Sequence, residues 1–401
     1  MIFISIHSLM NTHKYTLRII LAGIFLSLIA ETAMAFFFNK VLEANEFLEV
    51  LNELPQGAIS DRQIKRTTLE NQELPDQPLE NTHFKSCKWN NLDAHDNELK
   101  NIIFEDCEFN SINMRNANLN NVQFINSTLT NVVMNNATLT QVKFIKSELV
   151  STDPNIDNSY NGLIADELLF KNSKLTSIGF FEAKGIFRFE ESTLYDVSGA
   201  GLLAGSALFF HKIQGSILDF RRSNLTDLEI IDSKIDKRSS AGGGSINNIR
   251  VENSELEFSL GDNSNIESAL FENSGDVVVG GGKNNKEVLV KDCPKDTFWL
   301  DVGGENFGSV VIENCHVADL AFSSSSGSKI TIKNSSANVL DFRKSSIEHL
   351  ILDNVKVTQK IKYHKTNIQN FESKNISFGK NIKVWNEDSN IEINPDKILD
   401  E

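Results

Sequence analysis

The chain has 401 residues, of which 40% are hydrophobic, and a formal net charge of −15 at pH 7. This length and composition suffice for a large buried core or for one long repetitive domain. The acidic balance disfavours nucleic-acid phosphates and anionic membranes, so we expect no nucleic-acid partner.

Residues 1–35 have the layout of a secretory signal peptide. Basic residues ending at Arg18 precede an apolar run over 19–30, and Ala33 and Ala35 form a small-x-small cleavage site. Cleavage at this site would release an exported protein. We therefore expect a periplasmic or extracellular location.

An uncleaved membrane anchor over residues 19–38 is the alternative for this segment. Glu31 would then lie within the hydrocarbon of the bilayer, where a charged side chain is unfavourable. The protein would in that case be anchored in the inner membrane. Contact with a membrane is expected only if the segment stays uncleaved.

Residues 36–80 predict a short N-terminal amphipathic helix followed by a polar linker. Apolar residues recur at helical spacing before Pro55 ends the run: Val41, Leu42, Phe47, Leu48, Leu51 and Leu54. The end of a repetitive domain exposes unpaired backbone and apolar interior. We therefore expect this segment to be an N-terminal cap, with a partner-binding helix as the alternative.

Between Asn81 and Ser151 a large apolar residue recurs at every fifth position, with one exception. Neither a helix nor a strand has a period of five. A square coil with five-residue sides has this period, and its four sides make a coil of twenty residues. Two series spaced by twenty are therefore expected to stack as the structural core: Phe84, Phe104, Phe124 and Phe144, and Leu99, Leu119 and Leu139.

A short motif within this stretch carries a family resemblance. Residues 117–121 read Ala-Asn-Leu-Asn-Asn and match the motif Ala-Asp/Asn-Leu-x-x in full, and residues 137–141 match it loosely. In this tandem register the chain resembles the pentapeptide-repeat family. The resemblance implies an all-β fold, a right-handed parallel β-helix of quadrilateral cross-section. Some cytosolic members resemble acidic DNA and protect topoisomerases, a minor alternative that the export signal contradicts.

The repeat continues beyond Ser151 in a looser form. A signature of the type apolar-x-x-Ser/Cys-x-apolar returns about every twenty residues, as in Phe170–Leu175 and Ile230–Ile235, and Phe371–Ile376 is a degenerate form of it. We therefore predict one solenoid domain over 81–376 with about fifteen coils. Residues 377–401 are expected to form a C-terminal tail or cap.

Glycine- and serine-rich segments interrupt the later coils. They are Ser198–Ser206, Ser239–Ser245, Gly280–Asn285 and Ser323–Ser328. Insertions in a solenoid emerge at corners, and several can line one face. These segments predict a binding surface on the second half, over 198–328, with unselected drift at tolerant corners as the alternative.

Catalytic residues are not evident. A carbohydrate-active β-helix enzyme, a lyase or hydrolase, would need paired carboxylates or acidic calcium ligands beside a basic residue. The best candidates are Asp219, Arg221, Arg222, Asp232, Asp236 and Lys237. However, residues 219–223 recur almost unchanged as 341–345, which is typical of repeat structure. We predict no catalytic, cofactor or metal residues, with such an enzyme as the alternative.

The function expected from these observations is that of an exported, noncatalytic scaffold or binding protein. Its solenoid surface would be presented to a protein or polysaccharide partner, without a cofactor. The eight histidines show no ligand spacing, and no phosphate loop or Cys-x-x-Cys pair occurs.

The four cysteines form two pairs with repeat spacing. Cys87 and Cys107 are twenty residues apart, Cys293 and Cys315 are twenty-two apart, and all occupy the same signature position. Adjacent coils place equivalent Cα atoms about 4.8 Å apart, within the roughly 4.4–6.8 Å that a disulfide spans. Both pairs are therefore disulfide candidates, and export would supply an oxidising compartment. Stacked reduced thiols are the alternative, because serine fills the same position elsewhere and parallel side chains strain the disulfide torsion.

Cell fractionation tests the predicted export. We expect a mature chain outside the cytoplasm with its first residue near Phe36, because signal peptidase cleaves after small residues. N-terminal sequencing of the fractionated protein measures this. An intact amino terminus in the membrane fraction would support the anchor, and an intact cytosolic chain would contradict both interpretations.

Overall fold

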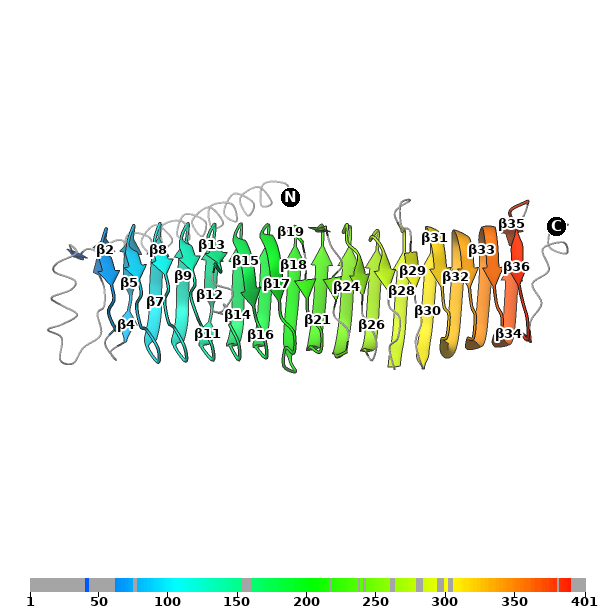
Figure 1. Ribbon diagram of the computed structural model, residues 1–401, viewed down its shortest axis with the longest axis horizontal. Coiled ribbons are helices and arrows are strands. Elements are labelled where there is room, and N and C mark those ends of the chain that lie inside the picture. Colours follow the sequence, from blue (N-terminus) through cyan, green and yellow to red (C-terminus); the bar gives the residue numbers. More distant parts are fainter. Residues whose placement is uncertain are drawn as a thin grey trace, which may run out of the picture.

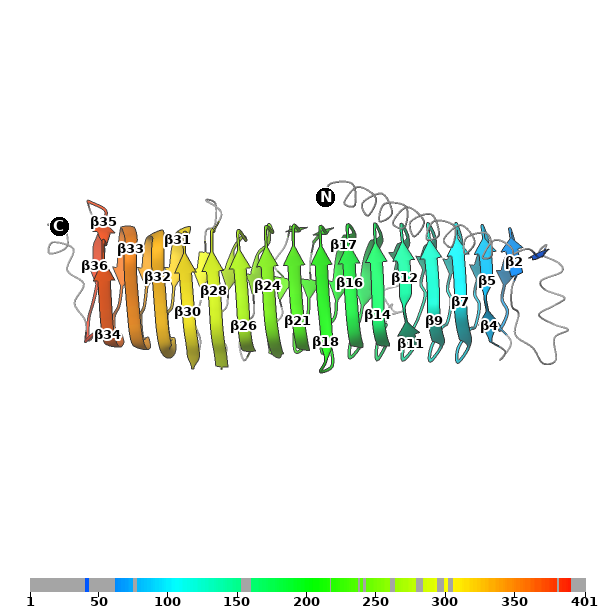
Figure 2. The same ribbon diagram turned by 180° about the vertical axis from the view of Figure 1, so that it is seen from behind.

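The computed structural model describes residues 40–42, 62–74, 78–152, 160–216, 218–236, 239–240, 243–259, 264–278, 284–293, 299–301, 306–380 and 382–390. Within them the chain forms a rod of stacked strands that follow one another in chain order from β2 to β36 (Figure 1). The view from behind shows the same succession (Figure 2). The predicted all-β parallel solenoid is confirmed.

The described residues form 36 strands and no helix. The strands of the regular first part are β1 (Lys40–Leu42), β2 (Arg62–Lys65), β3 (Thr68–Glu70), β4 (Leu79–Glu80), β5 (Thr82–Lys85), β6 (Lys88–Asn90), β7 (Glu98–Glu105), β8 (Glu108–Asn110), β9 (Asn118–Ile125), β10 (Thr128–Thr130), β11 (Thr138–Thr140), β12 (Val142–Ile145) and β13 (Glu148–Val150). The middle part comprises β14 (Ile164–Lys171), β15 (Lys174–Gly179), β16 (Lys184–Glu190), β17 (Thr193–Ser198), β18 (Ser206–His211), β19 (Gln214–Gly215), β20 (Leu218–Asp219), β21 (Asn224–Ile231), β22 (Lys234–Ile235), β23 (Ser239–Ser240) and β24 (Ser245–Glu252). The last part comprises β25 (Phe258–Ser259), β26 (Asn265–Glu272), β27 (Val277–Val278), β28 (Asn284–Lys291), β29 (Trp299–Asp301), β30 (Phe307–Glu313), β31 (His316–Ala321), β32 (Ser326–Asp341), β33 (Ser346–Lys362), β34 (Asn367–Lys374), β35 (Ser377–Phe378) and β36 (Lys383–Trp385).

Strands of successive coils pair in parallel and in register. Phe104 pairs with Phe124, and Leu99 pairs with Leu119. From Phe84 onward, one column of paired positions has fifteen members within the described residues: Phe84, Phe104, Phe124, Phe144, Phe170, Phe189, Phe210, Ile230, Val251, Phe271, Val290, Ile312, Ile332, Leu352 and Ser373. Each member marks one coil.

Left-handed backbone marks the corners of the coils. From Asn81 to Lys146 every fifth residue has a positive φ, so that each coil of twenty residues turns four times. Most of these corners are asparagine, which tolerates this conformation better than other residues with a Cβ. Asparagines also stack: Asn101 Nδ2 donates to Asn81 Oδ1 at 2.8 Å, and Asn121 Nδ2 donates to Asn101 Oδ1 at 3.0 Å.

The interior is a ladder of stacked rings. Phe84, Phe104, Phe124 and Phe144 are fully buried, and their successive ring centroids lie 5.0, 5.0 and 4.7 Å apart. The stack continues through Phe170, Phe189 and Phe210. The aliphatic series Leu99, Leu119 and Leu139 is also fully buried.

Paired strands extend beyond the expected limits of the solenoid. β2 pairs with β5 one coil before residue 81, and β36 pairs with β33 beyond residue 376. Val41 and Leu42, which the sequence assigned to an amphipathic helix, lie instead in β1 and pair with β2. The remainder of that helix, the signal segment 1–35, the alternative anchor 19–38 and the last residues 391–401 lie outside the described residues. Within the described residues, no helix is long and apolar enough to cross a membrane.

Replacing Phe124 tests the inward assignment. Phe124→Asp would place an unpaired charge between Phe104 and Phe144, and we expect the chain to be insoluble or unfolded because that charge has no partner in the core. The matched control is Gln123→Asp, which changes the adjacent half-exposed residue of β9 and should melt like the wild type. Circular dichroism melts measure both. Cooperative unfolding of Phe124→Asp at the wild-type temperature would contradict the assignment.

Candidate functional site

A polar groove runs along the solenoid across its later coils. It encloses about 820 Å³. Two rows of residues line it, and each row follows one column of the stacked strands. The first row is Ser245, Asn265, Asn284, Asn306, Ser326 and Ser346. The second row is Asn247, Glu267, Lys286, Gly308, Ser328 and Glu348, with Gln369 on the next coil. We call this feature the axial groove.

Two glycines make the axial groove deeper, because no side chain rises from the backbone at their positions. A Cβ on Gly308 would lie 2.4 Å from the carbonyl oxygen of Lys286. A Cβ on Gly327 would lie 2.4 Å from the ring of Phe307, so the ring takes the space that a side chain at Gly327 would need. Phe307 itself is buried, as is the other apolar lining residue, Ile266. The groove surface is therefore mainly amide, hydroxyl and backbone.

Charge in the axial groove is small. Lys286 Nζ lies 2.6 Å from Glu267 Oε2, and both side chains are more than half exposed. Such an exposed ion pair adds little stability but cancels the two charges locally. Among the described lining residues, Glu348 is the remaining charged one. Asn284 Nδ2 donates to Asn265 Oδ1 at 3.2 Å along the first row.

The axial groove overlaps the surface expected from the loop-rich segments. Ser245, Asn284 and Ser326 come from three of those four segments, whereas 198–206 does not line the groove. The groove also extends past residue 328, to Glu348 and Gln369. These two residues have no distinctive sequence motif. Only the column register places them beside the others.

The acidic and basic candidates lie elsewhere and pair locally. Arg221 Nε donates to Asp219 Oδ1 at 2.9 Å, and Arg343 Nε donates to Asp341 Oδ1 at the same distance. In each pair the arginine backbone N–H also donates to that oxygen, at 3.1 Å. Asp219 and Asp341 occupy one column of paired strands. The pairs are therefore one repeated structural unit.

The other candidates do not converge on one point. Asp232 accepts a hydrogen bond from Asn253 at 3.2 Å along the neighbouring coil. Arg222 lies at a corner with positive φ, and Asp236 is exposed. Lys237 lies outside the described residues. None of the five described candidates lines the axial groove. The described residues also hold no group of three or more His, Cys, Asp or Glu side chains suited to a metal ion.

One further carboxylate lies in the column of Asp341. Asp301 is two coils away, with Ala321 between them. Burial, followed by the charge of Asp341, raises the pKa of Asp301 to about 6. Burial opposes ionisation of Asp341 as well, but its hydrogen bonds with Arg343 hold its pKa below the usual value. A raised pKa on one carboxylate and a lowered pKa on its neighbour are typical of catalytic acid–base pairs. Asp341, however, already forms ion pairs with Arg343 and with Lys362, whose Nζ lies 3.3 Å from Oδ2.

The cysteines belong to a column that serine mostly fills. Cys107 N donates to Ser127 Oγ at 3.1 Å, and Ser127 N donates to Ser147 Oγ at 3.2 Å. Ser127 Oγ in turn donates to the carbonyl of Ile125 at 3.0 Å. A buried backbone N–H requires an acceptor. The side chains of this column supply one from the next coil, which explains why small polar residues recur there.

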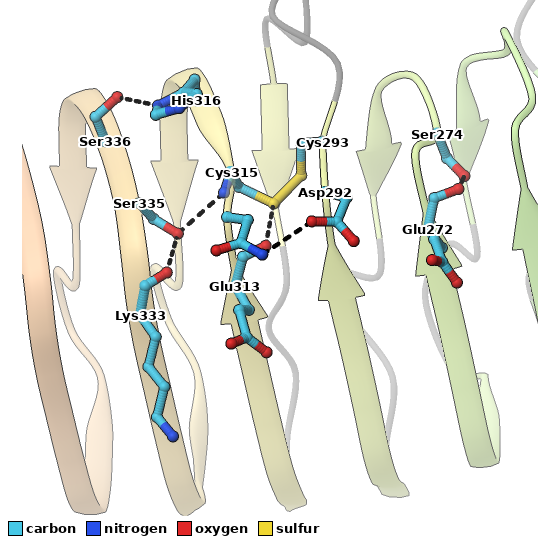
Figure 3. The surroundings of a disulfide bond; sticks show 11 residues. Glu272, Ser274, Asp292, Cys293, Glu313, Cys315, His316, Lys333, Ser335 and Ser336 are labelled. Atoms are coloured by element: carbon cyan, nitrogen blue, oxygen red, sulfur yellow. Dashed lines mark hydrogen bonds between the residues drawn. A yellow bond between two sulfur atoms is a disulfide. The ribbon is translucent and has the colours of Figure 1, made fainter.

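The two cysteine pairs differ in the structure. Cys293 and Cys315 form a disulfide with their Cα atoms 4.6 Å apart, beside the serine column (Figure 3). Cys87 and Cys107 are buried free thiols, and Cys87 N donates to Cys107 Sγ at 3.4 Å. Contact with Cys87 and burial raise the pKa of the Cys107 thiol. A thiol held protonated in this way reacts slowly.

The stacked parallel coils define this chain as a β-solenoid repeat protein. A family model described as a pentapeptide repeat region matches residues 77–153. This segment contains the twenty-residue columns of the core, and the predicted resemblance is confirmed. Over residues 77–153 the chain resembles the pentapeptide-repeat family.

Other comparisons are more distant. No curated protein matches the chain. Among solved structures, the chain is similar to HetL, a pentapeptide repeat protein involved in heterocyst differentiation regulation from the cyanobacterium Nostoc sp.. The match has 11% sequence identity and a TM-score of 0.22, and it covers 59% of this chain and 89% of HetL.

Mass spectrometry of the non-reduced protein, alkylated after denaturation, tests the cysteine arrangement. We expect a peptide linked through Cys293 and Cys315 and alkyl groups on Cys87 and Cys107. Cys293→Ser should lower the free energy of unfolding by about 3 kcal/mol through loss of the cross-link. Cys87→Ser is the control and should change it little, because serine fills the same column. Four alkylated cysteines would contradict the disulfide, and a peptide linking Cys87 to Cys107 would contradict the free thiols.

Proposed function

We propose that this protein is an exported, noncatalytic scaffold that binds a protein or polysaccharide partner along the axial groove. The observation that carries the proposal is the continuous polar lining of the groove over seven successive coils. Such a surface is large enough for an extended partner. Export rests on the signal-peptide layout of residues 1–35 and is part of the same proposal.

The groove supports binding better than catalysis. Among the described residues, two carboxylates line the groove. Glu267 and Glu348 are four coils apart through Lys286, Gly308 and Ser328. At about 4.8 Å a coil this places their Cα atoms roughly 19 Å apart. Paired carboxylates in glycosidases lie about 5–9.5 Å apart. Glu267 and Glu348 therefore do not form such a pair.

The proposal also explains the composition of the groove. A binding surface needs donors and acceptors that remain free in the absence of the partner, and amides and hydroxyls provide both. Repetition supplies them at regular intervals along the rod. A rigid surface of this kind loses little conformational freedom when a partner binds, which favours affinity.

Co-sedimentation with the cell-envelope fraction of the producing organism tests this function. We expect the mature protein to bind and Ser328→Ile to bind about tenfold less, because isoleucine would fill the groove without hydrogen-bonding groups. Thr128→Ile is the matched control: Thr128 is exposed on β10, six coils before the first groove residue, Ser245. Both changes introduce a β-branched residue that suits a strand.

The same preparation tests the enzymatic alternative. Incubation with polysaccharides should release no reducing ends and no unsaturated products. Product release that Asp301→Asn or Asp341→Asn abolishes would overturn the proposal in favour of a carbohydrate-active enzyme. Absence of binding by the wild type would overturn the proposed binding role.

A further inference from the structure

We infer that the ligand of the axial groove is an uncharged polysaccharide that lies along the solenoid axis. This inference rests on the proposed binding function and adds the chemical class and orientation of the partner. Three features of the groove lead to it: the kind of polar group, the absence of exposed apolar anchors among its described residues, and the regular spacing of equivalent residues.

The polar groups match the hydroxyls of a sugar. Eight of the lining residues are asparagine or serine, and Gln369 adds a further amide. Amide and hydroxyl side chains both donate and accept hydrogen bonds. Sugar hydroxyls do the same, so each hydroxyl can both donate a hydrogen bond to the groove and accept one from it. A polyanion would instead require arginine or lysine, and Lys286 is already paired with Glu267 at 2.6 Å.

A protein partner fits the same surface poorly. Protein interfaces depend on a few buried anchors, commonly Trp, Tyr or Arg, which insert into apolar pockets. The apolar residues of the groove, Ile266 and Phe307, are 1% and 2% exposed and offer no such contact. A peptide added as an extra strand needs an open sheet edge. Here β28 pairs with β26 on one side and β30 on the other, so no edge opens along the middle of the groove. An unpaired edge lies only at its end, on β34, which pairs with β33 alone among the described strands.

The spacing favours a polymer over a single sugar. The first row repeats from Ser245 to Ser346, one residue a coil, at intervals of about 4.8 Å. With the coil of Gln369 included, the groove is roughly 29 Å long. A chain of repeating units can make the same contact several times, and each unit after the first binds as part of a molecule that is already held. Affinity should therefore rise with chain length and level off once the ligand spans the groove.

Calorimetric titration with defined oligosaccharides tests the inference. The probes are neutral cello-, laminari- and manno-oligosaccharides of two to eight sugars, with polygalacturonate as the anionic comparison. We expect at least one neutral series to bind about tenfold more tightly as the hexasaccharide than as the disaccharide. Ser328→Ile should weaken hexasaccharide binding about tenfold or more, and Asn265→Ala should weaken it less.

Controls separate this inference from the proposed function. Thr128→Ile should bind as the wild type does, and circular dichroism should show all variants folded. Preference for polygalacturonate, equal affinity at every length, or unchanged binding by both groove variants would overturn the inference. No binding to any neutral series, together with Ser328-dependent binding to the envelope fraction, would overturn the polysaccharide and leave the scaffold function in place.

Discussion

Stacking of equivalent residues from coil to coil is the constraint on which this structure depends. No single coil buries a core of its own. Phe124 is covered on its two faces by Phe104 and Phe144, at ring-centroid distances of 5.0 and 4.7 Å. Each side chain must therefore fit its counterparts in the coils before and after it. This requirement explains why seven coils in succession keep a phenylalanine in one column, from Phe84 to Phe210.

The inward columns were predictable because burial restricts the residue at that position to a similar apolar type in every coil. The first coil, by contrast, was missed although Ile64, Leu69, Leu74 and Leu79 keep the five-residue spacing and are buried. The polar stretch that follows Pro55 suggested a linker there instead. The polar residues between these positions concealed the five-residue repeat, which continues in the twenty-residue columns of the later coils.

The axial groove was not predictable in the same way. Its lining residues face outward, where many polar side chains are equally acceptable, so no strict column identifies them. Its depth depends on Gly308 and Gly327, in adjacent coils, and on the ring of Phe307. In the sequence, these glycines are indistinguishable from those of loops. Only the register, which sets residues about twenty apart side by side, brings the lining together.

Repetition also explains why this solenoid suits recognition better than chemistry. Catalysis requires unlike groups within a few ångströms of one reacting atom. A column instead places similar groups at equal intervals, as the stacked side chains of Asn81, Asn101 and Asn121 show. An equal interval is an advantage when the ligand also repeats, because every coil then makes the same contact. The stacking that places one phenylalanine on the next inside the rod also aligns amide and hydroxyl side chains along its surface. The interval between equivalent groove residues is therefore the same as the interval between coils of the core.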